Sequence, residues 1–186
     1  YVNNLCAVLL RRKKYAEALA VMKAALPESR GTHSFHNKIG FVAHYLRCLN
    51  HTSQHRTAEN YAETYLRAFR KEIFEHRWHA FFIAYLETLL AQNNYLKIGR
   101  TIEKYQLLKR DETYVEKGAY LPTIPWFHTV SALKMHRITG EKARAALLQS
   151  LESLTMTSDK VNQINELLLE LQLHVPELVE VVRGRL

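Results

Sequence analysis

Helical segments recur in pairs along this chain, and their spacing constrains the fold more than any other feature of the sequence. The second helix of each pair is expected to begin near Tyr15, Thr57, Tyr95 and Glu141, which gives a period of about 40 residues. A single helical hairpin cannot bury its apolar face alone, so consecutive hairpins must stack on one another. The period therefore predicts an all-α stack of helical hairpins.

The apolar residues inside these segments are spaced as on one face of a helix. Ile164, Leu167, Leu168 and Leu171, for example, lie at positions i, i+3, i+4 and i+7. Almost no segment has the alternating pattern of a strand, and glycine and proline fall between the apolar segments. Helices are expected over residues 2–13, 15–26, 34–49, 57–73, 75–92, 95–109, 125–138, 141–154, 159–173 and 176–184.

The length of 186 residues suits one domain or one continuous array of small units. We therefore expect residues 1–186 to form a single helical-repeat domain. The two cysteines, Cys6 and Cys48, lie in apolar helical patterns without a close partner in the sequence, which favours buried free thiols over a disulfide. Free thiols suit a reducing compartment, so the expected location is cytoplasmic.

The sequence has neither a membrane-spanning pattern nor a leader pattern. No apolar run approaches the roughly 20 residues that a transmembrane helix needs. No signal-peptide pattern of basic, apolar and small-residue regions opens the chain. The chain begins with Tyr1 instead of methionine, directly in apolar helical sequence, and we interpret it as a fragment of a longer protein.

The formal net charge of +8 is concentrated at one place, because half of the excess lies in the run RRKK at residues 11 to 14. This run falls at the expected end of a helix, where cations interact favourably with the helix dipole. A solvated helix end is therefore the preferred interpretation of the run. The overall positive charge favours anionic partners, either acidic peptides or nucleic acid.

The first hairpin carries a pattern of large and small residues at fixed places. The pattern consists of Val2, Leu5, Cys6 and Leu9 in the first helix and Tyr15, Ala18, Met22 and Ala25 in the second. This arrangement resembles the tetratricopeptide repeat, in which small residues stand where the two helices of a hairpin cross closely. By the same resemblance, Tyr1 holds the third place of its repeat, so a neighbouring segment is expected to cover the exposed face of helix 2–13.

The later hairpins resemble the same family less closely. Ile39 and Gly40 are assigned to the Leu-small site of the second hairpin, and Trp78 and Trp126 to the bulky site of the third and fourth. The resemblance covers residues 1–155, with the best match over the first 30. It implies a right-handed α-solenoid of about four stacked hairpins, with a C-terminal capping hairpin. The first helices of the hairpins, the A helices, would line a concave groove.

The chain lacks the motifs of catalysis and of metal binding. His33-x-x-His36 and His76-x-x-His79 have helical spacing, but no third ligand or cysteine pair completes a zinc site. Nucleophile-elbow, P-loop and dinucleotide-binding glycine motifs are also missing from the sequence. We therefore expect no enzyme activity, no metal and no cofactor.

Partner binding is expected in the groove, at A-helix residues left over once the core is assigned. These are Asn37, Lys38, His44, Tyr45, Arg47, His79, Ile83 and His128. The leading hypothesis is a scaffold that binds a peptide or a helix of another protein, and acidic sequences fit the charge. One alternative is RNA binding, since pentatricopeptide arrays, which read RNA bases, are built of related hairpins, and this chain carries a basic charge. Another is a helper or regulatory module of a larger enzyme or sensor.

Overall fold

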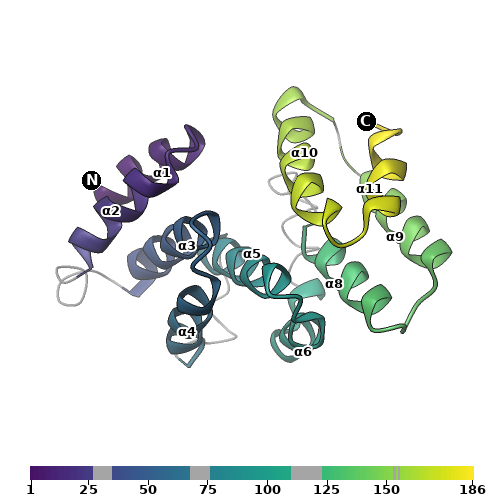
Figure 1. The fold of residues 1–186 in the computed structure, drawn as a ribbon, viewed down its shortest axis with the longest axis horizontal. Helices are drawn as coiled ribbons and strands as arrows, with labels where there is room; N and C mark the ends of the chain where they lie inside the picture. The colour runs from purple at the N-terminus through teal and green to yellow at the C-terminus, as the bar shows by residue number, and fades with distance from the viewer. Residues whose placement is uncertain (27–34, 68–75, 110–122, 153, 155) are drawn as a thin grey trace. The chain divides into compact units, whose positions relative to one another are not determined.

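A computed structural model of the chain describes residues 1–26, 35–67, 76–109, 123–152, 154 and 156–186 (Figure 1). These residues form helices and connecting turns, with no strand among them, which confirms the all-α prediction. They divide into two compact units, Tyr1–Asn94 and Tyr95–Leu186. None of the helices in the described ranges combines the length and the apolar character that crossing a membrane requires.

The first unit consists of two helical hairpins and a fifth helix. Its helices are α1 (Val2–Arg11), α2 (Tyr15–Ala25), α3 (Phe35–His51), α4 (His55–Leu66) and α5 (His76–Ala91). Helix α1 packs on α2, and both pack on α3. In the same way α3 packs on α4, and both pack on α5. Each hairpin of this unit therefore lies against the first helix of the next pair.

The turns after α1, α3 and α5 share one backbone conformation. Lys13, Ser53 and Asn93, spaced 40 residues apart, have φ angles of 57°, 58° and 57°. After α1, the Lys13 N–H donates to the Leu10 carbonyl and the Lys14 N–H to the Leu9 carbonyl, each at 2.9 Å. The same two bonds recur after α3 and α5. This Schellman arrangement ends each A helix in the left-handed region, and it makes the 40-residue period a backbone repeat.

This repeat corrects the register expected for the second hairpin. Cys6 lies 12 residues before Ala18, and its Sγ lies 3.9 Å from the Ala18 carbonyl oxygen. Counted from the next turn, the same two places hold Leu46 and Ala58, all four residues being fully buried. Assigning Gly40 to the place of Cys6 was therefore wrong by six residues. The reason is that α3 has 17 residues against 10 in α1 and gains its extra length before the crossing point.

Helix α5 forms the centre of the first unit. Trp78, Phe81, Phe82 and Tyr85 are all buried, and the Trp78 and Phe81 rings meet edge to face with centroids 5.4 Å apart. These residues cover most of the circumference of the helix, which packs on both α3 and α4. The densest apolar stretch of the sequence is thus core, as its pattern indicates.

A polar contact joins α3 to α5 within this core. The Asn50 Nδ2 donates to the Ala84 carbonyl at 3.0 Å, and the fully buried Thr88 donates its hydroxyl proton to the Asn50 Oδ1 at 2.8 Å. Buried polar groups are tolerated where they satisfy one another in this way. Since the bonds require one relative placement of the two helices, they specify the register between α3 and α5.

The second unit contains α6 (Tyr95–Tyr105), α8 (Thr123–Lys134), α9 (Gly140–Glu152), α10 (Ser158–Gln172) and α11 (Pro176–Arg183). Helix α8 packs on α6 and α9, and α11 packs on α9 and α10. A Cβ on Gly99 of α6 would lie 3.1 Å from the Ser131 Oγ of α8, so the two helices cross closely there. The Ser131 hydroxyl donates to the Tyr95 carbonyl at 2.7 Å. The expected C-terminal hairpin is present as α10 and α11.

Several helix boundaries differ from the expected ones by a few residues. Helix α4 begins at His55, two residues before the expected Thr57, because Gln54 already follows the Schellman turn. Helix α8 ends at Lys134, four residues before the expected end, since His136 adopts the left-handed conformation with φ of 56°. The expected continuation of α4 over residues 68–73 lies outside the described residues.

Candidate functional site

Helices α3 and α5 each carry a line of residues that are half-buried or exposed. On α3 this line consists of Gly40, His44, Arg47 and His51, and on α5 it consists of Ala80, Glu87 and Ala91. The spacing of four, three and four residues on α3 places its members on one helical face. We call these seven residues the A-helix stripe. Because α3 and α5 pack on each other, their two lines belong to one surface of the first unit.

Three functional groups form the centre of the A-helix stripe: the His44 imidazole, the Arg47 guanidinium and the Glu87 carboxyl. Arg47 interacts electrostatically with both of the others. Arg47 and Glu87 lie 40 residues apart and hold the same place before their turns. The repeat thus sets a cation on α3 beside an acid on α5.

Burial sets the charge of His44. Loss of solvation, together with the nearby Arg47 cation, lowers the pKa of His44 from 6.5 to about 4. The imidazole is therefore neutral at pH 7. Its Nδ1 atom is buried and has no hydrogen-bond partner among the described residues. A buried nitrogen left in this way costs about 1–3 kcal/mol.

Burial acts in the opposite direction on Glu87. It raises the pKa of Glu87, while the Arg47 guanidinium opposes this by favouring the carboxylate. The rest of the α5 line is alanine, so space beside this carboxyl is not filled by large side chains of α5 itself. The centre of the stripe therefore offers one cation, one acid and one neutral imidazole, flanked by His51 and by the small residues Gly40, Ala80 and Ala91.

The groove residues expected from the sequence differ widely in their exposure to solvent. Lys38, His44 and Arg47 are half-buried on α3, and the side chain of Asn37 lies outside the described residues. Tyr45 is 5% exposed and packs edge-on against Tyr61 of α4, with ring centroids 4.9 Å apart. It points toward its own hairpin partner.

The other expected groove residues are placed differently. His79 and Ile83 are buried in α5, with exposed fractions of 0% and 9%. His128 is half-buried in α8 of the second unit, where burial lowers its pKa and the charges of Glu103 and Arg137 act in opposite directions. In the first unit, the structure thus brings together His44 and Arg47 with Glu87, which was missing from the expected set. The 40-residue spacing from Arg47 is the sequence signal that would have identified it.

The stripe does not gather the ligands of a metal site. No group of three or more His, Cys, Asp or Glu residues in the described part of the chain is placed to hold a metal ion. The side chains of His33, His36 and His76 lie outside that part. Both cysteines are free and buried, as the sequence indicates. Burial raises the pKa of the Cys6 thiol, and it raises the pKa of the Cys48 thiol to about 12. Neither thiol is an activated nucleophile.

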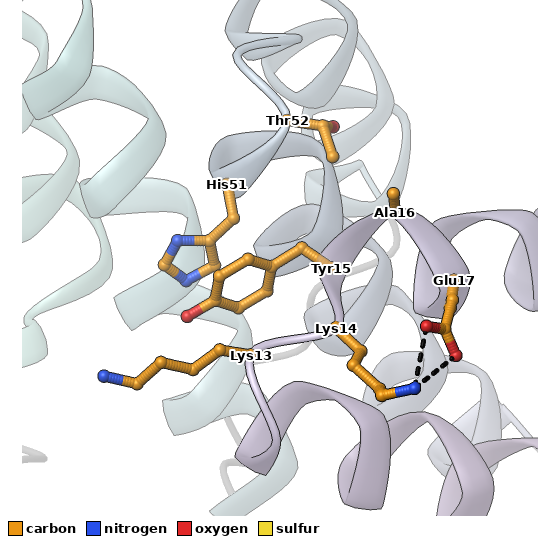
Figure 2. A pocket seen from close by; sticks show the side chains of 7 residues that line it. All are labelled: Lys13, Lys14, Tyr15, Ala16, Glu17, His51 and Thr52. Atoms are coloured by element: carbon orange, nitrogen blue, oxygen red, sulfur yellow. Dashed lines mark hydrogen bonds and ion pairs between the residues drawn. The ribbon is translucent and has the colours of Figure 1, made fainter.

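An open pocket of about 340 Å³ adjoins the end of the stripe at His51 (Figure 2). It is lined by Lys13, Lys14, Tyr15, Ala16, Glu17, His51 and Thr52. The Tyr15 ring stacks on the His51 ring, with centroids 3.9 Å apart and planes 15° apart. The Lys14 Nζ donates to both carboxylate oxygens of Glu17, at 2.9 and 3.1 Å.

The polar groups of this pocket mainly hold the junction between hairpins together. The Thr52 hydroxyl donates back to the Cys48 carbonyl at 2.8 Å, which is an ordinary contact within a helix end. The stacked rings of Tyr15 and His51 join α2 to α3.

Comparisons with known proteins add no family to this description. No protein-family model, no curated protein and no solved structure matches the chain. The resemblance to tetratricopeptide repeats therefore rests on the residues of the hairpins.

Proposed function

We propose that this chain is a tetratricopeptide-like α-solenoid scaffold whose A-helix stripe binds a peptide or a helix of a partner protein. The observation that carries the proposal is the cluster of His44, Arg47 and Glu87 on an open face of two packed helices. The stacking of each hairpin on the next A helix and the 40-residue turn repeat support the solenoid architecture.

The groups on the stripe specify what kind of segment would bind. Arg47 and the half-buried Lys38 favour a carboxylate, which Arg47 can hold through two parallel hydrogen bonds. The half-buried carboxyl of Glu87 adds one acceptor. Ala80 and Ala91 leave room for apolar side chains. The expected ligand is an amphipathic segment with an acidic residue beside its apolar face.

Selection from a peptide display library, followed by fluorescence anisotropy with the selected peptide, tests this proposal. Replacing Arg47 by alanine is expected to weaken binding by about tenfold or more, since hot-spot truncations commonly cost over 1.4 kcal/mol. Arg144→Ala, on an exposed position of α9, serves as the matched control and leaves affinity unchanged. Equal binding by the wild type and the Arg47→Ala variant would refute the assignment of the stripe.

RNA binding is a second candidate, favoured by one observation. The exposed Lys13 and Lys14 line one pocket with the stacked rings of Tyr15 and His51, and the exposed Arg11 and Arg12 directly precede them in the chain. Basic and aromatic groups together are typical of single-strand binding surfaces. If this surface binds RNA, affinity for a polyuridine oligonucleotide falls steeply as salt is raised and falls again in an Arg11→Glu variant. No binding at low salt would eliminate this candidate.

A further inference from the structure

The turn after α1 carries charge that the equivalent turns after α3 and α5 lack. Lys13 has the same left-handed backbone as Ser53 and Asn93. Glycine and asparagine are the residues that most readily adopt this conformation, so the conformation itself does not call for a lysine. Lys14 follows, where the turn after α3 has the neutral Gln54. The backbone of the turn therefore does not explain two adjacent lysines.

The stacked rings beside this turn are also specific to the first junction between hairpins. Tyr15 of α2 and His51 of α3 stack with their centroids 3.9 Å apart. At the end of α5, Ala91 takes the place of His51 and offers no ring. The second junction nevertheless packs in the same way, since α3 packs on α4 and both pack on α5. Packing of the hairpins therefore does not require the stacked pair.

The charged groups of the pocket point in two directions (Figure 2). The Lys14 ammonium donates to both carboxylate oxygens of Glu17, at 2.9 and 3.1 Å, so these two charges offset each other. The Lys13 ammonium and the Tyr15 hydroxyl point away from Glu17, on the side where the His51 ring lies. Glu17 is the one acid among the lining residues. The side with Lys13 is therefore positive, and it offers an ammonium, a hydroxyl and an imidazole to an anion.

These groups suit a phosphate monoester better than a carboxylate. A phosphoryl group carries a charge of about −1.5 to −2 and three strong acceptor oxygens. A lysine binds it as a point charge, and hydroxyl and ring N–H groups add hydrogen bonds. The pocket volume of about 340 Å³ lies within the range of about 300–1,000 Å³ of small-molecule sites. The space therefore admits a phosphorylated side chain.

The distribution of charge favours a single phosphoryl group over a nucleic-acid strand. A strand needs cations repeated along its path, because each phosphate that is neutralised adds to the affinity. The equivalent places in the turns after α3 and α5 hold Ser53, Gln54, Asn93 and Asn94, all of them neutral. The cations of this turn therefore do not continue from one turn to the next.

We infer that the pocket of Lys13, Tyr15 and His51 binds the phosphorylated side chain of a partner protein. His51 is also the last α3 residue of the A-helix stripe, so the pocket adjoins the surface proposed to bind a peptide. The inference rests on the proposed function only in taking the partner to be a protein. Phosphorylation of the partner then strengthens binding, because it adds the charge that Lys13 meets.

Titration of the isotope-labelled chain with N-acetyl-O-phosphoserine amide, followed by heteronuclear NMR, tests the pocket. The amide resonances of Lys13, Lys14 and Ala16 are expected to shift saturably, with an affinity at least tenfold above that for N-acetylserine amide. Lys13→Asn introduces the residue that the turn after α5 has at this place, so it keeps the backbone and is expected to weaken binding about tenfold. Lys23→Gln removes the same charge from an exposed position of α2 and is the matched control, with unchanged affinity.

Glu17→Gln distinguishes a phosphoryl site from a turn with a purely structural role. This change removes the acid that offsets Lys14, so it is expected to strengthen binding of the phosphoserine probe about threefold. A structural role alone would not raise the affinity for an anion. Unchanged or weaker binding of the probe by Glu17→Gln therefore contradicts the assigned ligand.

Two other results overturn the inference. One is the absence of any shift at Lys13 and Lys14 upon addition of the phosphoserine probe. The other is binding of a polyuridine oligonucleotide at these residues with a salt dependence that indicates several phosphate contacts, because the surface then binds RNA. Arg47→Ala, which tests the A-helix stripe, is expected to leave the affinity for the probe unchanged. Failure of the stripe and failure of the phosphoryl site are therefore told apart.

Discussion

The free energy of unfolding of the first unit is expected to fall as the pH drops, because of His44. Burial and Arg47 lower its pKa to about 4 in the folded chain, against 6.5 for an exposed imidazole. The unfolded chain therefore takes up the proton first as the pH falls below about 6.5. The folded state loses stability from there down to about pH 4, where it too becomes protonated.

The size of the effect follows from the two pKa values. Over the whole range from neutral pH to well below about pH 4, the difference between the two pKa values lowers the free energy of unfolding by about 3 kcal/mol. Between about pH 7.5 and about pH 5, the linkage relation gives a loss of about 2 kcal/mol. This range stays above the pH at which most exposed carboxylates titrate. A loss of this size is a large part of the stability of an ordinary domain.

Urea unfolding of His44→Leu beside the parent chain measures this loss. Trp78 lies in the first unit and Trp126 in the second, so a Trp126→Phe background makes fluorescence report on the first unit alone. Over this pH range the free energy of unfolding of the parent chain is expected to fall by about 2 kcal/mol more than that of the His44→Leu variant. Other groups titrate in both proteins and cancel in the comparison. Equal losses in the two proteins would refute the assigned environment of His44.

Three further changes test other parts of the structure. Asn93→Gly is expected to stabilise the first unit by up to about 1 kcal/mol in urea unfolding, whereas Asn93→Ala destabilises it, since residue 93 has positive φ. Cys6 and Cys48 are expected to react with a thiol reagent only upon unfolding, and fast labelling of the native chain would contradict their burial. Gly99→Ala is expected to destabilise the second unit by about 1 kcal/mol, because its Cβ would lie 3.1 Å from the Ser131 Oγ, and the gain in stability usual for Gly→Ala in a helix would refute the close crossing.

The helices themselves were predictable because apolar spacing is a local property. Ile164, Leu167, Leu168 and Leu171 are all buried on one face of α10, as their spacing indicates. The approximate 40-residue period was also readable. The period is the same across three turns because Lys13, Ser53 and Asn93 all adopt the left-handed conformation. None of the three is glycine, the residue that usually signals this turn, so the exact spacing was not readable from the sequence.

Which side of an A helix stays open was not predictable in the same way. His79 was expected in the groove, but it is fully buried, because α5 packs on two neighbouring helices. A polar residue on a long helix gives no local signal of which neighbours surround it. Glu87 was missed for the related reason that Arg47, the charge beside it, belongs to another helix.

The strict spacing of the turns affects both the A-helix stripe and the apolar positions at which the hairpins pack on one another. Because the A helices end at equivalent residues, side chains 40 apart fall at the same height on neighbouring helices. At one such level, Arg47 faces Glu87 on the open stripe, and the corresponding residue of α1 is Ala7, which carries no charge. At the next level, Cys48 and Thr88 are buried between hairpins while Val8 is exposed. A single repeat length thus separates the polar stripe from the apolar positions at which the hairpins of the first unit pack on one another, so a substitution on one leaves the other in register.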